Sequence, residues 1–371
     1  MFVKSLALRR RLVRVMAAFM VVTMVLVVTG GCSTIGYYAQ SVHGHLSMLA
    51  AARPIDELLA DPRTDMPLRT RLEQVQRMRA FASRELGLPD NASYTRYADL
   101  KRPYVIWNVF ATRELSLRLE EWCFPITGCV GYRGYFDKSS ADAEAAALAA
   151  RGFDVHVGGV PAYSTLGWFD DPVLNTFIGQ PEGDVARLIF HELAHQVVFV
   201  KGDTTFNESF ATTVEQEGVK RWFAAHANAA QIAAYENLVA RRTDFLALLM
   251  RTKNKLEAVY KSDLPDAQKR ERKTELFAQL RREYETMKRE RWNGYAGYDR
   301  WFARELGNAQ LASVAAYTQL VPAFNALLER EGRDLDRFYE RAKQLGKLDR
   351  AARAKALAEL CAACAENEPR P

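Results

Sequence analysis

Two histidines and a glutamate, His191, Glu192 and His195, stand in the segment RLIFHELAHQ. On an α-helix, side chains four positions apart lie on the same face about 5 to 6 Å from each other, so both imidazoles can bind one metal ion. Glu192 is turned roughly 100° around the helix axis, where it can contact a water molecule without being a ligand. This HExxH spacing is typical of zinc hydrolases, in which three protein ligands leave one position open for water.

The third ligand is predicted at Glu208, in the segment NESFA. It follows His195 by 13 positions, which allows a first helix to end at Gly202 and a second helix to return beside it. A carboxylate there would complete a set of two histidines and one glutamate around a single Zn²⁺ ion. Glu215 and Glu217, further along the same predicted helix, are weaker candidates for this ligand.

These residues also have purely structural interpretations. The two histidines of the motif could be core or capping residues, and Glu208 could be a carboxylate that the dipole of a helix N-terminus stabilises. In a chain with only six histidines, however, a chance match to the motif is expected in roughly one case in a hundred or fewer. His156 and His226 have no ligand partner at helical spacing, so we expect them on the surface or in a strand.

The N-terminus predicts export. Residues 1–31 contain Lys4 and four arginines but no acid, followed by an uncharged run over 15–29 and by the segment GGCS. This order of basic, apolar and small residues is typical of a secretory signal. The run is shorter than the roughly 20 residues that cross a bilayer, which favours a cleaved signal over an uncleaved anchor. Cysteine at the cleavage point resembles a bacterial lipoprotein signal, which implies lipid on Cys32 and, from Ser33, sorting towards the outer membrane.

Charge and size restrict the function further. The formal charge is +6, and removing the five basic residues of 1–31 leaves +6 − 5 = +1. A nearly neutral body has no electrostatic surface for a polyanion, so nucleic acid binding is excluded. With 371 residues and 49% hydrophobic content the chain can bury a large core. We expect this body at the bacterial cell envelope, facing the periplasm.

Cysteine spacing is compatible with an oxidising compartment. If Cys32 carries lipid, four cysteines remain, and an even number suits disulfide pairing. Cys123 and Cys129 enclose a short turn-prone segment, WCFPITGC, and are predicted partners. Cys361 and Cys364 form a CxxC in an alanine-rich helical segment with no second CxxC, so a zinc or redox role is not expected there, and their pairing is left open.

The rest of the chain predicts an α+β fold that is predominantly helical. We expect a signal peptide over 1–31, a helical segment over 32–100, a core with a small sheet and the metal site over 101–240, and a helical hairpin with further helices over 241–371. Aromatic and β-branched runs between 104 and 177 predict the sheet, and apolar residues at helical spacing predict the helices. The edge strand of the sheet should come directly before the HExxH helix.

Several breaks in the pattern predict where helices start and stop. Two helices are expected between residues 37 and 88, interrupted at Pro54 and at DPRTDMP. The HExxH helix should begin near Pro181 and end at Gly202. Residues 241–292 are charged and periodic, with a break at Pro265, which predicts a helical hairpin with a solvated face.

The sequence also resembles a known group of enzymes. HELAHQ followed by NESFA is similar to the gluzincin metallopeptidases, whose zinc aminopeptidases carry HELAHQ and NEGFA. YFD at 135–137, YSTLGWFDDPVLNTF at 163–177, RLIFHELAHQ, KGDTTFNESFAT and the stretch from NAQL to VPAF resemble a bacterial family described as putative aminopeptidases, over most of the mature chain. This resemblance implies that His191, His195 and Glu208 bind one zinc ion, that Glu192 is the general base, and that the substrate is a peptide.

The resemblance also implies substrate contacts. Gluzincins bind the peptide backbone along an edge strand, and AYSTLGWF is the candidate here, with the stretch from Tyr163 to Gly167 facing the cleft. A tyrosine or histidine commonly stabilises the oxyanion in such enzymes. Tyr317 is our candidate, with Tyr295 and Tyr298 as rivals, and each could instead be a packing residue.

Aminopeptidases hold the free amine of the substrate with a carboxylate. The segment YSTLG contains no acid, so Asp170 and Asp171 are the nearest candidates. We therefore expect a zinc-dependent peptidase of the cell envelope, preferably an aminopeptidase. Two further functions stay open: a scaffolding lipoprotein with a structural zinc, whose hairpin over 241–292 binds a partner, and a zinc hydrolase of another amide, such as a cell-wall bond.

Overall fold

The structure is a computed structural model that describes residues 36–124, 128–162 and 164–362. The predicted signal peptide 1–31, the lipid attachment site Cys32, the candidate Tyr163 and the cysteine Cys364 lie outside the described residues. Sorting to a membrane therefore stays a prediction, and the pairing of Cys361 with Cys364 stays open.

Helices dominate the fold, as expected. They comprise a helix over residues 36–51 and α2 (Ile55–Ala60), α3 (Met66–Leu86), α4 (Lys138–Ala150), α5 (Asn175–Ile178), α6 (Glu182–Ala194), α7 (Thr204–His226), α8 (Ala229–Lys261), α9 (Asp266–Glu290), α10 (Asp299–Phe302), α11 (Asn308–Thr318), α12 (Val321–Arg330), α13 (Leu335–Lys347) and α14 (Arg350–Ala362). The strands are β1 (Arg53–Pro54), β2 (Arg96–Ala98), β3 (Ile106–Arg113), β4 (Trp122–Phe124), β5 (Gly128–Val130), β6 (Arg133–Tyr135), β7 (Phe153–Val160) and β8 (Val173–Leu174).

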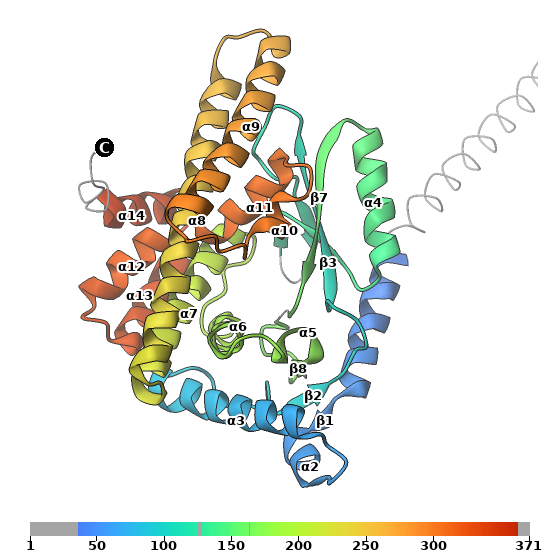
Figure 1. Cartoon of the computed structure of the whole chain (residues 1–371), viewed down its shortest axis with the longest axis vertical. Coiled ribbons are helices and arrows are strands. Elements are labelled where there is room, and N and C mark those ends of the chain that lie inside the picture. Colours follow the sequence, from blue (N-terminus) through green and yellow to red (C-terminus); the bar gives the residue numbers. More distant parts are fainter. Residues whose placement is uncertain (1–35, 125–127, 163, 363–371) are drawn as a thin grey trace, which may run out of the picture.

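The longest strands form an antiparallel sheet in the order β6-β3-β7. Successive side chains of a strand point to opposite faces. On one face, Trp107 and Val109 pack with residues of α4, while Ile106, Asn108 and Phe110 on the other face line a cavity. Figure 1 shows α4 on the outer side of β3 and β7, and α6, α7, α8 and α11 on the inner side. The sheet is thus a wall between a small outer core and the interior.

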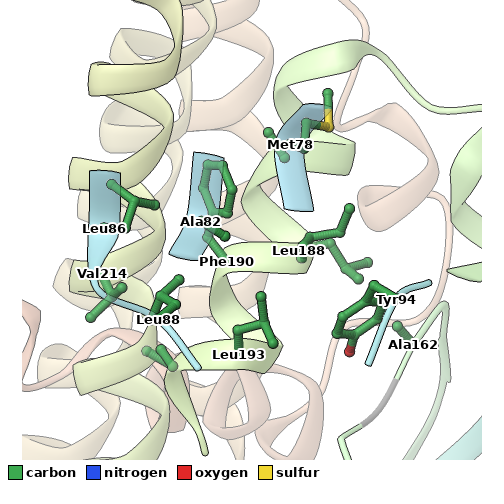
Figure 2. Close-up of a cluster of buried hydrophobic side chains, with 14 of the residues drawn as sticks. Met78, Ala82, Leu86, Leu88, Tyr94, Ala162, Leu188, Phe190, Leu193 and Val214 are labelled. Atoms are coloured by element: carbon green, nitrogen blue, oxygen red, sulfur yellow. The ribbon is translucent and has the colours of Figure 1, made fainter. Parts of the chain in front are cut away.

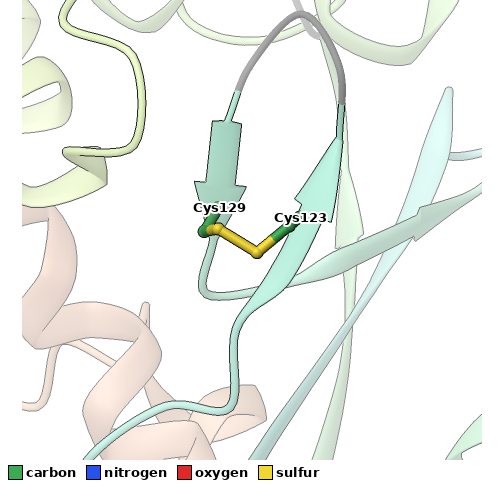
Figure 3. Close-up of a disulfide and its surroundings, with 2 residues drawn as sticks. All are labelled: Cys123 and Cys129. Carbon is green, nitrogen blue, oxygen red and sulfur yellow. A yellow bond between two sulfur atoms is a disulfide. The ribbon is translucent and has the colours of Figure 1, made fainter.

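The predicted cysteine pair is bridged. Cys123 on β4 and Cys129 on β5 are directly opposite partners in this two-stranded sheet, and a disulfide joins them (Figure 3).

The main core surrounds α6 and α7. Figure 2 shows Met78, Ala82 and Leu86 of α3 beside Leu188, Phe190 and Leu193 of α6 and Val214 of α7. Gly218 of α7 is required for this close approach, because a Cβ there would lie 2.8 Å from both Leu86 and Phe190. A glycine inside a helix destabilises it by about 1 kcal/mol relative to alanine. Here the absence of a side chain allows the helices to pack closely.

The predicted hairpin is present, with α8 and α9 joined at residues 262–265. Pro265 is the N-cap of α9 and has no N–H for the preceding turn to use. Leu248, Leu256 and Leu280 fill a second hydrophobic cluster between the two helices. Figure 1 shows the tip of this hairpin extending away from the body.

The C-terminal helices α11 and α12 pack on α7. Residues 308–330 are long and apolar enough to cross a membrane by composition alone. Leu311 and Phe324 are nevertheless buried at 1% and 0% exposure, in separate clusters of the protein core. The two helices are therefore explained as core helices.

Three expectations about local structure were wrong. The N-terminal part has three helices before residue 88, because α2 forms between the two predicted breaks. Helix α6 ends at Ala194, not at Gly202, and His195 is its C-cap. Residues 164–169 of the predicted edge strand AYSTLGWF form no strand, and residues 166–169 form a turn and a bend. The φ angles of Leu166 and Gly167, 58° and 79°, are left-handed and incompatible with a strand.

Candidate metal centre

Helices α6 and α7 position the predicted metal-binding residues. His191 lies in the last turn of α6, His195 caps this helix, and Glu208 lies in the second turn of α7. The connection between them is held by Asn207, whose side chain accepts from the N–H of Val200 at 2.7 Å and donates to its carbonyl at 2.8 Å. The short connection therefore sets how Glu208 faces the two histidines.

The three side chains converge. His191 Nε2 lies 3.2 Å from His195 Nε2 and 3.1 Å from Glu208 Oε2, and His195 Nε2 lies 3.6 Å from the same oxygen. A tetrahedral ion with bonds of about 2.0 to 2.2 Å holds its ligand atoms about 3.3 to 3.6 Å apart. The geometry therefore fits a metal ion bound by two imidazole nitrogens and one carboxylate oxygen, and these residues form a group that could hold one.

Glu215, considered as a rival ligand, contacts the opposite side of His191. Its Oε2 lies 2.9 Å from His191 Nδ1, and its Oε1 lies 3.4 Å from guanidinium nitrogens of both Arg187 and Arg242. A carboxylate on Nδ1 fixes the orientation of the imidazole and leaves Nε2 as the ligand atom. Glu215 is thus a partner of His191 and not a member of the converging group.

Glu217, the second rival ligand, is engaged away from the metal-binding group. It pairs with Arg221 at 2.9 Å and also with Arg333. His226 stacks on the ring of Trp222 at 3.9 Å, and His156 lies in the strand β7, where burial lowers its pKa to about 4. As expected, neither histidine joins the group.

The electrostatics of the group favour a cation. Burial opposes ionisation of Glu208 and Glu215, but nearby cationic groups outweigh it and lower the pKa of each carboxyl to about 2. Burial also opposes a positive charge on His191, yet the bonds from both carboxylates raise its pKa to about 10. Two ionised carboxylates around one imidazole therefore create a buried position that attracts positive charge, whether proton or metal ion.

Glu192 lies beside this group but outside it. It lines the same cavity as His191 and Glu208. Burial raises the pKa of its carboxyl, and the neighbouring His191 and His195 offset this only in part. A carboxylate with a raised pKa is suited to taking up and returning a proton near neutral pH.

A cavity of about 870 Å³ opens in front of the metal-binding group. Its walls are the inner face of the sheet, helices α6 and α7, and parts of α8 and α11. Most side chains that line it are apolar or aromatic; the aromatic ones are Tyr37, Tyr38, Phe110, Phe124, Tyr132, Phe136, Phe199, Phe245, Tyr298 and Tyr317. Such a cavity has the size and character of a site for a small molecule or a peptide segment.

Of the candidate tyrosines, Tyr317 lies at the metal-binding group. Burial, with the negative charges of Glu208 and Glu192, raises its pKa well above the ordinary value. Tyr298 also lines the cavity, whereas Tyr295 does not and instead lies 4.4 Å from the guanidinium of Arg241. Burial, and then the negative charges of the same two glutamates, raise the pKa of a second phenol, Tyr132. Sequence spacing offered no signal for Tyr132, because it reaches the site from the sheet.

The predicted substrate contacts next to residue 163 are only partly met. Gly167 is exposed and does not line the cavity, whereas Ser164 and Leu166 do. Asp170 is exposed and Asp171 is buried, and neither lines the cavity. The left-handed turn at residues 166–167 is the reason, because it directs the following residues away.

Asn108 is a cavity residue that sequence reasoning missed. It is 3% exposed in the middle of β3, and its Oδ1 has no hydrogen-bond partner among the described residues. Its neighbours across the sheet are Gly134 and Gly158, which leave room above the amide. Buried polar atoms are nearly always bonded, so this one is a candidate for contact with a ligand. The signal was present as a single polar residue in the apolar run VIWNVFA.

The fold and the site define a class: an α+β protein, mostly helical, with a buried group of two histidines and a glutamate that could hold a metal ion beside a peptide-sized cavity. The family model described as "Putative aminopeptidase" matches residues 36–357. This match spans most of the chain, and the protein belongs to that family. Comparisons with curated proteins and with solved structures found no match.

Proposed function

We propose that this protein is a zinc-dependent peptidase of the gluzincin type, with His191, His195 and Glu208 as the ligands of one zinc ion. The observation that carries the proposal is the convergence of these three side chains at 3.1 to 3.6 Å, with Glu192 beside them. Membership of an aminopeptidase family makes a peptide the expected substrate.

The residues of the cavity then have distinct roles. A zinc ion at this position would supply Lewis acidity, which polarises a peptide carbonyl and makes a water molecule acidic enough to ionise near pH 7. Glu192 accepts a proton from the attacking water and later donates it to the leaving amine. Tyr317 and Tyr132 keep their protons, because their pKa values are raised, and can donate hydrogen bonds to the developing oxyanion.

The number of converging side chains favours catalysis over a structural zinc. Structural zinc sites are normally closed by four protein ligands. Within the described residues the converging group has three members, and Glu215 contacts the far nitrogen of His191 instead of completing it. This supports a peptidase over a scaffolding protein.

Cleavage of internal peptide bonds is a second candidate specificity. The acids that line the cavity are Glu192, Asp203, Glu208 and Glu215. Glu208 and Glu215 bond to His191, and Asp203 pairs with Arg353 at 2.8 Å. The described cavity residues therefore offer no uncommitted carboxylate for the free amine of a substrate, apart from the proposed base.

The same proposal places the protein at the bacterial cell envelope, anchored by lipid on Cys32 and facing the periplasm, with the outer membrane favoured. The disulfide between Cys123 and Cys129 supports this location, because structural disulfides persist in oxidising compartments. The signal-like N-terminal sequence supports it independently.

Metal analysis of the purified full-length protein tests the proposal. We expect one zinc per chain, loss of peptide hydrolysis when a chelator removes it, and recovery when zinc is returned. Protein without zinc, and without activity on zinc addition, would overturn the proposal. Paired peptides with a free and an acetylated N-terminus separate the two specificities, because an aminopeptidase cleaves only the first and an endopeptidase cleaves both.

A further inference from the structure

The helix over residues 36–51 has one face that packs on the protein. Tyr37 lies against the ring of Tyr135 at 5.5 Å, and Gln40 accepts a hydrogen bond from the N–H of Phe136 at 3.0 Å. Gly44 meets the side chain of Phe136 so closely that no Cβ would fit, and Met48 is buried. This face fixes the helix to the body next to β6.

The opposite face of this helix is exposed and apolar. Tyr38, Val42 and Leu46, each one helical turn apart, are 41%, 57% and 55% exposed. The helix carries no Asp, Glu, Lys or Arg, and none occurs anywhere in residues 15–52. A helix face that meets water normally carries charged or polar residues, so this face requires a different neighbour.

A neighbouring loop enlarges the exposed apolar surface. Trp168 is 71% exposed and Phe169 49%, and the ring of Phe169 lies 4.6 Å from that of His45 on the helix. The N–H of Thr165 donates to the buried carboxyl of Asp171 at 2.8 Å, which braces the base of this loop. We call Tyr38, Val42, Leu46, Trp168 and Phe169 the apolar patch. Monomeric soluble proteins seldom expose such a cluster without a binding role.

We propose that the apolar patch inserts into the surface of a lipid bilayer and so orients the protein on the membrane. The chain itself argues for this occupant. The uncharged run over 15–29 and the candidate lipid site Cys32 stand just before residue 36. The four residue steps from Cys32 to Gly36 span at most about 14 Å, so either kind of anchor holds the helix at the bilayer. Exposed Trp and Tyr are also typical of the membrane interface.

Docking would bring the border of the cavity to the membrane. Tyr38 belongs both to the apolar patch and to the cavity wall, and Ser164 and Leu166, from the same loop as Trp168, line the cavity too. The inference goes beyond the proposed peptidase function: it depends on the proposed membrane anchor and not on the chemistry of the metal-binding group.

Tryptophan fluorescence of the full-length protein in phosphatidylcholine vesicles tests the proposal. Trp168 is a suitable reporter, because Trp107, Trp222 and Trp292 are 8% exposed or less and Trp122 and Trp301 are partly buried. Bromine on the acyl chains quenches an indole only when the two are in contact. We expect lower emission in brominated than in plain vesicles for the wild type, and equal emission for Trp168→Phe. Equal emission for the wild type would overturn the proposal.

Charge on the apolar patch should abolish this contact. Val42→Glu combined with Leu46→Glu is expected to remove the quenching by bromine while the melting temperature stays unchanged, because both side chains are exposed. Leu264→Glu, a matched change at an exposed leucine on the hairpin tip, should leave the quenching intact. Quenching that persists in the double variant would contradict the assignment of this face.

The experiment can also reveal a second copy of the chain bound to the apolar patch. If the patch binds a second copy, the detergent-solubilised wild type will sediment as a dimer, the double glutamate variant as a monomer, and Trp168 will stay unquenched. That outcome also overturns membrane docking. Zinc content and peptide hydrolysis of the variants in detergent should equal those of the wild type, so a failure of docking is distinguishable from a failure of the proposed peptidase.

Discussion

The consecutive helices α6 and α7 and the consecutive helices α8 and α9 use their charged residues differently. In the first pair Glu208, Glu215 and Glu217 are between 1% and 9% exposed, and each has a specific cationic or imidazole partner. In the hairpin, Glu257 forms ion pairs with Lys253 and Lys261 at the surface. The side chains of Glu257 and Lys261 are both well exposed. Removing a buried charge from water costs several kcal/mol, so each buried glutamate depends on its own partners. Exposed pairs contribute little and are replaceable.

The largest expected effect is at Glu192, the partly buried acid that we propose moves the proton. Glu192→Gln keeps the shape of the side chain but cannot accept a proton, so peptide hydrolysis should fall at least 10²- to 10⁴-fold. Zinc content, measured on the same sample, should stay at the wild-type value, because Glu192 lies outside the proposed set of ligands. His195→Ala is the control, and it should lose both zinc and peptide hydrolysis. Near-normal hydrolysis by the glutamine variant would remove Glu192 from the mechanism.

Replacing Glu215 should lower the affinity for zinc more than it affects the catalytic step. Glu215→Gln weakens the hydrogen bond to His191 Nδ1 and leaves Arg187 and Arg242 without their shared carboxylate. We expect zinc affinity, measured by competition with a chelator, to fall about 10- to 100-fold. Glu217→Gln is a matched control: it is also buried on α7, but its partners are Arg221 and Arg333, so it should lower stability and leave zinc affinity unchanged. Equal affinity for both variants would contradict the positioning role.

Asp171 is a buried acid without a cationic partner in the described structure. It therefore differs from the buried glutamates of α7, each of which has a cationic or imidazole partner. Burial raises its pKa from 3.8 to about 7. Between these pH values the folded protein binds more protons than the unfolded chain, so the free energy of unfolding falls as pH rises, by up to about 4 kcal/mol.

Asp171→Asn should remove this pH dependence, since the amide oxygen can still accept from Thr165. Urea unfolding between pH 4 and pH 8 measures it. The wild type should lose stability over this range and the variant should lose less, while Asp170→Asn at the exposed neighbouring position should behave like the wild type. An identical slope for Asp171→Asn would show that this carboxyl titrates in its ordinary range.

At Gly218, helix packing and helix propensity predict changes of opposite sign in the free energy of unfolding. Alanine favours a helix over glycine by about 1 kcal/mol. Gly218→Ala should nevertheless destabilise the protein by about 1 to 3 kcal/mol, because the added carbon would lie 2.8 Å from Leu86 and Phe190. Thermal unfolding measures the change. A stabilised variant would show that the helices can separate at no cost.

The smallest effect is expected in the hairpin. Glu257→Gln removes the surface bridge to Lys253 and Lys261 and should change the free energy of unfolding by less than about 1 kcal/mol. The change should shrink further at high salt, because salt screens exposed charges. A larger loss, or one insensitive to salt, would mean that the hairpin depends on its charges as α7 does.

Local patterns predicted much of this molecule. The HExxH spacing, the following glutamate, the break at Pro265 and the cysteine pair in WCFPITGC are all short-range features, and the structure contains the elements expected from them. The prediction of an edge strand at AYSTLGWF was wrong. Its aromatic and β-branched residues are typical of a strand, but Leu166 and Gly167 adopt left-handed backbone conformations. Hydrogen bonds between Thr165 and both Asp171 and Phe169 stabilise those turns locally.

The amino-acid sequence alone determined which residues could bind a metal, because the helical repeat places His191 and His195 on one face whatever surrounds them. Tertiary structure alone decided that Glu215 contacts the far nitrogen of His191, that Tyr132 and Tyr317 join the site, and that Asn108 faces the cavity between two glycines. Those relations bring β3, the segment between β5 and β6, and α11 to the pair α6 and α7, although these parts are distant in the chain. No local periodicity encodes which of their side chains meet once the core has excluded water.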